Sequence, residues 1–186
     1  MHEHMKENDR HVAASESDLI GLSTAAVLVT YNRLHLLKRS LQSVLDQTLR
    51  PDVIIVVDNH STDGTTAWLE SYTKDMDGVE ILLLPENKGA SGGFGRGIRR
   101  AYESGADWIW TLDDDTIAEP DTLEKLIERI RPMSQATLHG VGYLCSKVVW
   151  GDGSRHVHNV PVPDRDWWEG YEVMPGSIRL YATTFV

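Results

Sequence analysis

Short continuous apolar runs recur along the chain as far as Leu112, and each is bounded by polar residues, Gly or Pro. Runs of this length without a polar interruption are typical of central strands in a parallel sheet, because such strands are buried on both faces. The sequence therefore predicts four strands, over Ala25–Thr30, Val53–Val57, Val79–Leu84 and Trp108–Leu112.

A segment with apolar residues at helical spacing follows each of these runs. The predicted helices cover residues 34–47, a segment that carries Trp68 and Leu69, a segment through Ile98, Ala101 and Tyr102, and residues 121–130. Strands that alternate with helices in this way are typical of α/β proteins. We therefore predict an α/β fold with a mainly parallel sheet flanked by helices.

The pattern changes after Leu138. Gly140–Trp150 and Ser177–Val186 have the composition of strands, and the residues between them are rich in Asp, Gly, Pro and Trp. Because the last apolar run has no closing helix, we expect the domain to be C-terminally truncated. The start of the chain is polar, so we predict a flexible N-terminal tail over residues 1–22 and one domain over 23–186.

Charge and cysteine content limit the classes of function. The formal net charge is −10, which argues against nucleic acid as a partner, since that would need a basic face. The single Cys145 cannot form an internal disulfide and favours a reducing compartment. No apolar run approaches the roughly 18 residues of a membrane span, and no signal-peptide core is present. These features predict a cytoplasmic protein.

Three adjacent acids, Asp113, Asp114 and Asp115, come directly after the fourth predicted strand. Ligands of open α/β sheets bind beyond the carboxyl ends of the strands. Three carboxylates there repel one another unless a cation or a ligand compensates, and hard oxygen ligands suit Mg²⁺ or Mn²⁺. The alternative is an acidic turn that only caps the next helix.

Other polar loops are predicted at the same edge of the sheet. They are Thr30–Arg33, Asp58–Asp63 and the Gly-rich loop Asn87–Gly93. Acids, amides, a lysine and glycines together suit a charged ligand rich in hydroxyl groups. Asp63 and Thr62 have an alternative role as helix caps. Neither G-x-G-x-x-G at a first βα turn nor a P-loop motif is present, so the common dinucleotide and P-loop classes are excluded.

Four motifs occur in order along this framework: Val29-Thr30-Tyr31-Asn32-Arg33, Val57-Asp58-Asn59-His60-Ser61-Thr62-Asp63-Gly64-Thr65, Glu86-Asn87-Lys88-Gly89 with Gly92-Gly93-Phe94, and Leu112-Asp113-Asp114-Asp115. Together they resemble the family-2 glycosyltransferases of the GT-A fold, the nucleotide-diphospho-sugar transferase fold. The bacterial rhamnosyl- and galactofuranosyltransferase-like members are the most similar. The resemblance covers residues 25–186.

The resemblance implies roles for single residues. Thr30, Tyr31 and Arg33 would line the nucleobase and ribose pocket, and Asp58 would accept from the base N–H with Asn59 beside it. The donor sugar and ribose would be flanked by the third motif, through Asn87, Lys88, Gly89 and Gly93.

The acidic motif would hold the metal. Asp113 and Asp114 match the front acids of the D-x-D motif, and Asp115 matches the acid that most directly holds the cation on the diphosphate. The implied cofactor is Mn²⁺ or Mg²⁺, with Asp115 and Asp113 as ligands. That ion would stabilise the departing nucleoside diphosphate as a Lewis acid.

The acceptor side is less complete. Trp167 and Trp168 are candidates for an acceptor-sugar platform, with packing under their loop as the alternative. In the family, the general base is an acid beyond the strand that matches Ala182–Val186, so no catalytic base is assigned in this chain. We interpret the chain as a fragment of a longer enzyme.

The sequence thus predicts a metal-dependent inverting glycosyltransferase domain that uses a UDP- or dTDP-sugar. The expected acceptor is a glycan or a lipid-linked saccharide in cell-surface polysaccharide synthesis, with peripheral membrane contact at the inner face. The first alternative is a non-catalytic nucleotide-sugar-binding module. The second is a phosphohydrolase with Asp113 as nucleophile and Asp115 as acid/base.

Overall fold

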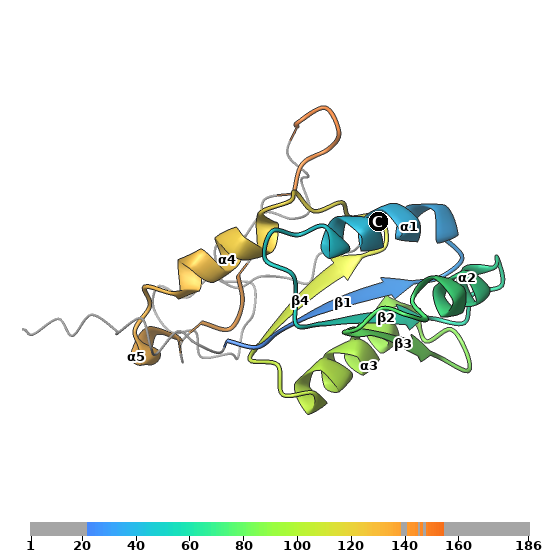
Figure 1. Cartoon of the computed structure of the whole chain (residues 1–186), viewed down its shortest axis with the longest axis horizontal. Helices are drawn as coiled ribbons and strands as arrows, with labels where there is room; N and C mark the ends of the chain where they lie inside the picture. Colours follow the sequence, from blue (N-terminus) through green and yellow to red (C-terminus); the bar gives the residue numbers. More distant parts are fainter. Residues whose placement is uncertain (1–21, 139–140, 145, 147, 155–186) are drawn as a thin grey trace, which may run out of the picture. The chain divides into compact units, whose positions relative to one another are not determined.

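The computed structural model describes residues 22–138, 141–144, 146 and 148–154. Two compact units divide between Gly142 and Tyr143. The first unit contains the helices and strands that the structure describes (Figure 1). They are β1 (Thr24–Thr30), α1 (Leu34–Leu45), β2 (Val53–Asp58), α2 (Thr65–Tyr72), β3 (Val79–Leu83), α3 (Gly89–Glu103), β4 (Trp108–Asp113), α4 (Thr122–Ile130) and α5 (Gln135–Leu138).

The sheet has four parallel strands in the order β3-β2-β1-β4, which confirms the predicted α/β class. In its register, Thr30 of β1 lies opposite Asp58 of β2, and Val29 lies opposite Asp113 of β4. The chain moves outward from β1 to β3 and then returns to the other side of β1. The strand order therefore reverses between β1 and β4, the place where open α/β sheets bind ligands.

Alternate residues of the two central strands face opposite layers. Ala26, Leu28, Ile54 and Val56 pack with the buried faces of α1 and α2, whereas Val27 and its alternating neighbours pack on the other side. Figure 1 shows α1 and α3 on opposite faces of the sheet. The continuous apolar runs are thus explained, since a strand covered on both faces needs apolar residues at every position.

The predicted Gly-rich loop Asn87–Gly93 is partly wrong, because α3 already begins at Gly89. A Cβ atom at Gly93 would meet Val29, and one at Gly97 would collide with Val27 and lie 3.0 Å from Val57. The glycines let α3 approach the sheet closely. Low helix propensity is overridden here by packing.

The second correction concerns Gly140–Trp150, which is not a strand in the part that the structure describes. A single bridge at Val149 is its one extended pairing there. A turn follows, in which Gly153 with φ of 81° donates its N–H to the Trp150 carbonyl at 2.8 Å. Gly142 inside the segment weakens a strand. The predicted tail over 1–22, except Leu22, and the run Ser177–Val186 lie outside the described residues.

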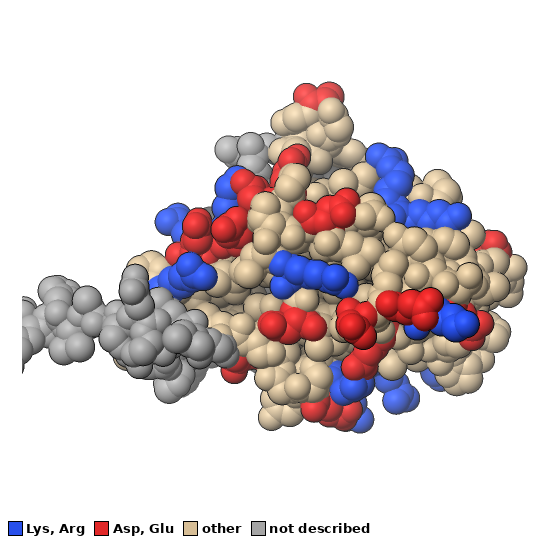
Figure 2. All heavy atoms as spheres, in the orientation of Figure 1, with Lys and Arg blue, Asp and Glu red and all other residues tan. Residues whose placement is uncertain are grey.

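Surface charges are mixed rather than segregated on the face drawn in Figure 2. Ion pairs join residues of opposite sign, as between Lys125 on α4 and Asp121 just before it, and between Arg100 on α3 and Glu80 on β3. Among the described residues, no helix has the length and apolar content that crossing a membrane requires.

Candidate functional site

Polar loops meet at the carboxyl edge of the sheet, around the reversal between β1 and β4. Thr30 ends β1, and Asp113 ends β4 beside it. The backbone N–H of Asn59 donates to the Thr30 carbonyl at 2.9 Å, which joins the end of β2 to the same place. The predicted convergence of these loops is confirmed.

Asp114 is the most buried acid of the group, with 4% of its surface exposed. The Thr30 hydroxyl donates to one carboxylate oxygen at 2.8 Å, and Arg33 Nη1 lies 3.4 Å from the other. Burial raises the pKa of Asp114, although the Thr30 hydrogen bond and the Arg33 charge act in the opposite direction. The side chain is therefore anchored inside the edge, facing β1.

Asp115 is more open, since a third of its side chain is exposed. Arg33 Nη1 donates to Asp115 Oδ2 at 3.1 Å, so one guanidinium nitrogen bridges two consecutive carboxylates. Arg33, which the family resemblance places at the nucleobase and ribose pocket, thus also compensates the charge of these acids.

Asp113 is the acid without such compensation. In the described part of the chain no group donates to its carboxylate, while its carbonyl accepts from Ser40 Oγ at 3.2 Å and from the Thr116 N–H at 3.1 Å. Burial, followed by the charges of Asp115 and Asp114, raises the pKa of Asp113 to about 7, with Arg33 opposing. A carboxylate held in this way is suited to a cation or a donating ligand.

The β1–α1 and β2–α2 loops are interlocked. Asn32 and His60 both adopt left-handed backbone conformations, with φ of 53° and 72°. The Asn32 N–H donates to Ser61 Oγ at 2.9 Å, and Asn32 Oδ1 accepts from the Thr62 N–H at 2.6 Å. Asn tolerates this conformation because its short amide bonds to nearby backbone. Hydrogen bonds therefore join the two loops directly to each other.

Asp63 binds the first backbone N–H group of two helices, although the N-cap residues themselves are Arg33 and Gly64. Its carboxylate accepts from the Leu34 N–H of α1 at 3.0 Å and from the Thr65 N–H of α2 at 3.1 Å. Burial acts to raise the pKa of Asp63, but the bonds from Thr65 and Leu34 outweigh it and hold the pKa below its usual value. Thr62 does not act in the same way, because it bonds to Asn32.

Asp58 and Asn59 lie inside the edge, with 1% and 2% of their surfaces exposed. Asp58 accepts from the Ser61 N–H at 2.9 Å and from the Thr66 hydroxyl. Asn59 donates to the Gly89 carbonyl at 3.0 Å and accepts from the Lys88 N–H at 2.9 Å. Asn59 thus connects the end of β2 to the first turn of α3.

The third motif forms the start of α3. Asn87 Oδ1 accepts from the Gly89 N–H at 2.8 Å, and the Lys88 ammonium pairs with Glu86. The Lys88 hydrogen bond and charge lower the pKa of Glu86. Gly93 faces Val29, as described above. Lys88 is half exposed, so its ammonium is accessible to a ligand.

The remaining predicted site residues are Tyr31 and the two tryptophans of the acceptor region. Tyr31 is 43% exposed beside the site, and Trp167 and Trp168 lie outside the described residues. Within the described ranges, no group of three or more His, Cys, Asp or Glu is arranged to hold a metal.

Sequence reasoning missed Ser40, which is fully buried on α1 and donates to the Asp113 carbonyl. A signal was present, because Ser40 interrupts the apolar stripe of Leu37, Leu41 and Val44. Thr66 was also missed, and Ser61 was part of the second motif without a role of its own; nothing in their spacing indicates the partners that they bind.

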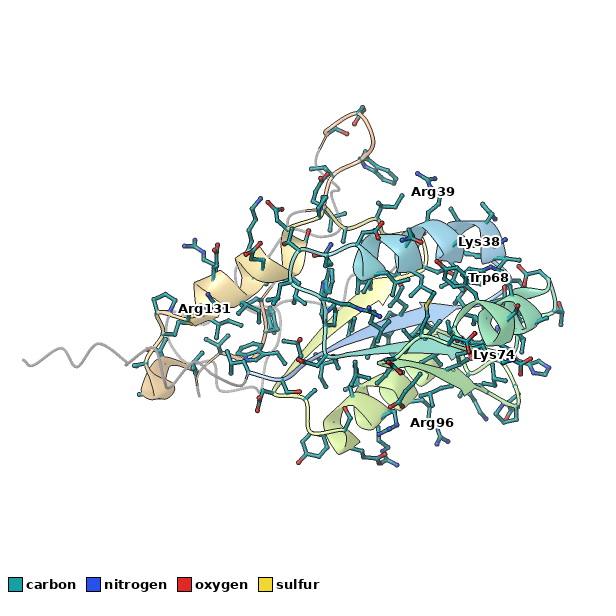
Figure 3. All side chains as sticks on the ribbon, in the orientation of Figure 1. Lys38, Arg39, Trp68, Lys74, Arg96 and Arg131 are labelled. Atoms are coloured by element: carbon teal, nitrogen blue, oxygen red, sulfur yellow. The ribbon has the colours of Figure 1, made fainter. Side chains whose placement is uncertain are left out.

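A separate groove of about 650 Å³ lies between α1 and α2. Lys38 (Figure 3) lies over the Trp68 ring at 5.3 Å from its centroid. The Trp68 ring also stacks on that of Tyr72. Its lining contains none of the predicted site residues. The groove therefore does not belong to the acidic edge.

The residues that form this edge lie within the part of the chain that is similar to known proteins. The model of the glycosyl transferase family 2 matches residues 25–175. The galactofuranosyltransferase GlfT1 of Mycolicibacterium smegmatis is 42% identical over 90 residues, covering 48% of this chain and 29% of the relative. An undecaprenyl-phosphate mannosyltransferase of Micrococcus luteus is 30% identical over 105 residues, covering 56% and 43%. The chain thus spans less than half the length of these relatives.

Solved structures give the same fold. The S. aureus TarS fragment 1–349, crystallised with UDP, superposes with a TM-score of 0.51 at 22% identity, over 58% of this chain and 32% of that one. The same fragment with UDP-GlcNAc also gives a TM-score of 0.51. The parallel sheet flanked by helices is that of the GT-A fold, as predicted.

Proposed function

We propose, since this chain belongs to the family-2 glycosyltransferases, that its acidic edge binds a nucleotide diphosphate sugar for metal-dependent, inverting transfer. The donor is a UDP- or dTDP-sugar, and the acceptor is a growing glycan or a lipid-linked saccharide of the cell surface. The observation that carries the proposal is the position of Asp113, Asp114 and Asp115 at the strand-order reversal, with one acid left uncompensated.

The acids fit a divalent cation. Asp113 has no described donor and a raised pKa, and Asp115 is open to solvent, so both offer oxygen ligands. Asp113 and Asp115 would hold Mn²⁺ or Mg²⁺. When bound, the ion would neutralise the charge that develops on the departing nucleoside diphosphate.

The remaining motif residues position the donor. Thr30 fixes Asp114, while Tyr31 and Arg33 border the space for the base and ribose. Asp58 and Asn59 are buried, so they act by holding the loops in place. Lys88 offers an accessible ammonium to the phosphates or sugar.

Partners and location follow from the same proposal. The names of the relatives, a galactofuranosyltransferase and an undecaprenyl-phosphate mannosyltransferase, support a glycan or lipid-linked acceptor. Such an acceptor would place the protein in the cytoplasm, in peripheral contact with the membrane. The family match argues against the phosphohydrolase alternative.

Calorimetric titration of UDP and dTDP tests the proposal, with Mn²⁺ or with EDTA, on wild type and Asp115→Ala. The exposed loop residue Asp75 provides a matched control, Asp75→Ala. We expect metal-dependent binding in wild type and the control, lost in Asp115→Ala. Absence of saturable binding in wild type would refute the proposal. Donor binding with neither transfer nor donor hydrolysis, measured in a separate activity assay on a chain that includes the family's general base, would favour the non-catalytic module.

A further inference from the structure

Arg33 occupies an unexpected place among the acids. Its Nη1 lies 3.1 Å from Asp115 Oδ2 and 3.4 Å from Asp114 Oδ1. The guanidinium thus takes up an oxygen of the residue that the proposed function assigns to a metal ion. Nearly half of the Arg33 side chain is exposed, so it can leave this position without unpacking the core.

The two acids differ in what else holds them. Asp114 is buried and also accepts from Thr30, so it keeps a partner when Arg33 moves away. Among the residues that the structure describes, Arg33 is the side chain that donates to Asp115. A cation that binds Asp115 therefore competes with Arg33, because both need the same carboxylate and repel each other at short range.

The nucleotide offers Arg33 a new partner. A diphosphate presents oxygens that a guanidinium fork binds with two hydrogen bonds. A metal ion that binds alone would have to displace Arg33 from Asp115 and would leave the guanidinium without a new anionic partner. Metal together with a nucleoside diphosphate would displace it and also supply the anion that it binds next.

We propose that Arg33 is an internal counterion that couples the two ligands, suppressing metal binding in the free protein and passing to the nucleotide when both bind. The inference rests on the proposed function, since it needs a metal-nucleotide site at Asp115. Coupling is reciprocal in binding free energy, so the metal must increase nucleotide affinity by the same factor that the nucleotide increases metal affinity.

The test measures Mn²⁺ affinity by electron paramagnetic resonance of free Mn²⁺, with and without saturating UDP. The variants are Arg33→Gln and Arg33→Lys, and Arg96→Gln is the control, because Arg96 lies exposed on α3 and points away from the sheet (Figure 3). We expect Arg33→Gln to bind Mn²⁺ alone about fivefold more tightly, and the enhancement by UDP to fall about tenfold. Arg33→Lys keeps the charge, so it should bind Mn²⁺ alone like wild type and lose part of the enhancement.

The outcomes separate the two proposals. If wild type binds Mn²⁺ and UDP together, but Arg33→Gln binds Mn²⁺ alone no more tightly than wild type, the counterion role is wrong and the proposed function stands. If wild type and the Arg96→Gln control bind no UDP with Mn²⁺, both proposals fail. An equal change in Arg96→Gln would also overturn the role of Arg33, because it would reflect net charge alone.

Discussion

The Thr30 hydroxyl donates to the Asp114 carboxylate at 2.8 Å, across 84 residues of sequence and inside the protein. This bond joins the end of β1 to the turn after β4, at the point where the strand order reverses. The bond holds Asp114, of the three consecutive acids, inside the protein. Asp113 and Asp115 then remain for the proposed ligand.

Replacing Thr30 by Val removes the hydroxyl while keeping the side-chain shape. We expect Thr30→Val to lower the free energy of unfolding by about 1–3 kcal/mol, because a buried carboxylate loses a donor. Urea denaturation at neutral pH measures the change. Thr30→Ser retains the hydroxyl and serves as the control, so equal stability of the two variants would contradict the importance of the bond.

Two glycines of α3 should respond in opposite ways to the same substitution. At Gly97 a Cβ would meet Val27 and Val57, whereas at Gly95 it meets nothing within 4 Å. We expect Gly97→Ala to destabilise the protein by about 1–3 kcal/mol through overpacking. Gly95→Ala should stabilise it by about 0.5–1 kcal/mol through helix propensity. Thermal unfolding of both variants checks this, and destabilisation by both would indicate that the helix itself requires glycine.

These glycines mark a limit of sequence reasoning. The apolar runs predicted all four described strands, most directly β1 and β2, because a strand that is buried on both faces is apolar at nearly every position. A glycine at 93 or 97 does not reveal whether it makes room for a ligand or for a neighbouring strand. The loop prediction therefore failed at the start of α3, where packing against Val29 and Val27 decides the conformation.

The site also combines features that the sequence predicts with features that it does not. The positions of the loops follow from the parallel strands, so the sequence could predict that Thr30 meets the acids. The partners within the loops could not, since hydrogen bonds between distant residues depend on geometry. Arg33 turned toward Asp115, and Asn59 turned inward to Gly89 and Lys88.

Asp63 should contribute to stability through two helix starts at once. Asp63→Ala leaves the Leu34 and Thr65 N–H groups without their acceptor, and we expect a loss of about 1–2 kcal/mol. The folded-state pKa of Asp63 is lowered, so its contribution is present above the unfolded pKa and is lost as pH falls through the folded value. Chemical denaturation at neutral and acidic pH measures both effects. Asp63→Asn retains an acceptor and should lose less; an equal loss would show that charge, not the hydrogen bonds, matters.

Asp113 should make stability depend on pH with the opposite sign. Its ordinary pKa is 3.8 and its folded pKa is about 7, so between these values the folded chain binds more protons than the unfolded chain. Its contribution is complete below pH 3.8 and is lost as pH rises through about 7. Solvent reaches part of this side chain, so we expect a loss of about 1–2 kcal/mol rather than the full value of the shift.

Urea denaturation of wild type and Asp113→Asn in EDTA, between pH 4 and 8, isolates this contribution. Other carboxyl groups titrate in both proteins, so the difference between the two curves reports Asp113. Asp113→Asn should gain stability relative to wild type as pH rises, because the amide carries no charge to desolvate. Saturating Mn²⁺ with UDP should remove this advantage, since a cation compensates the carboxylate of wild type alone. If the free energies of unfolding of the two proteins change with pH in parallel in EDTA, Asp113 ionises with its ordinary pKa. Its carboxylate would then carry no uncompensated charge in the folded protein.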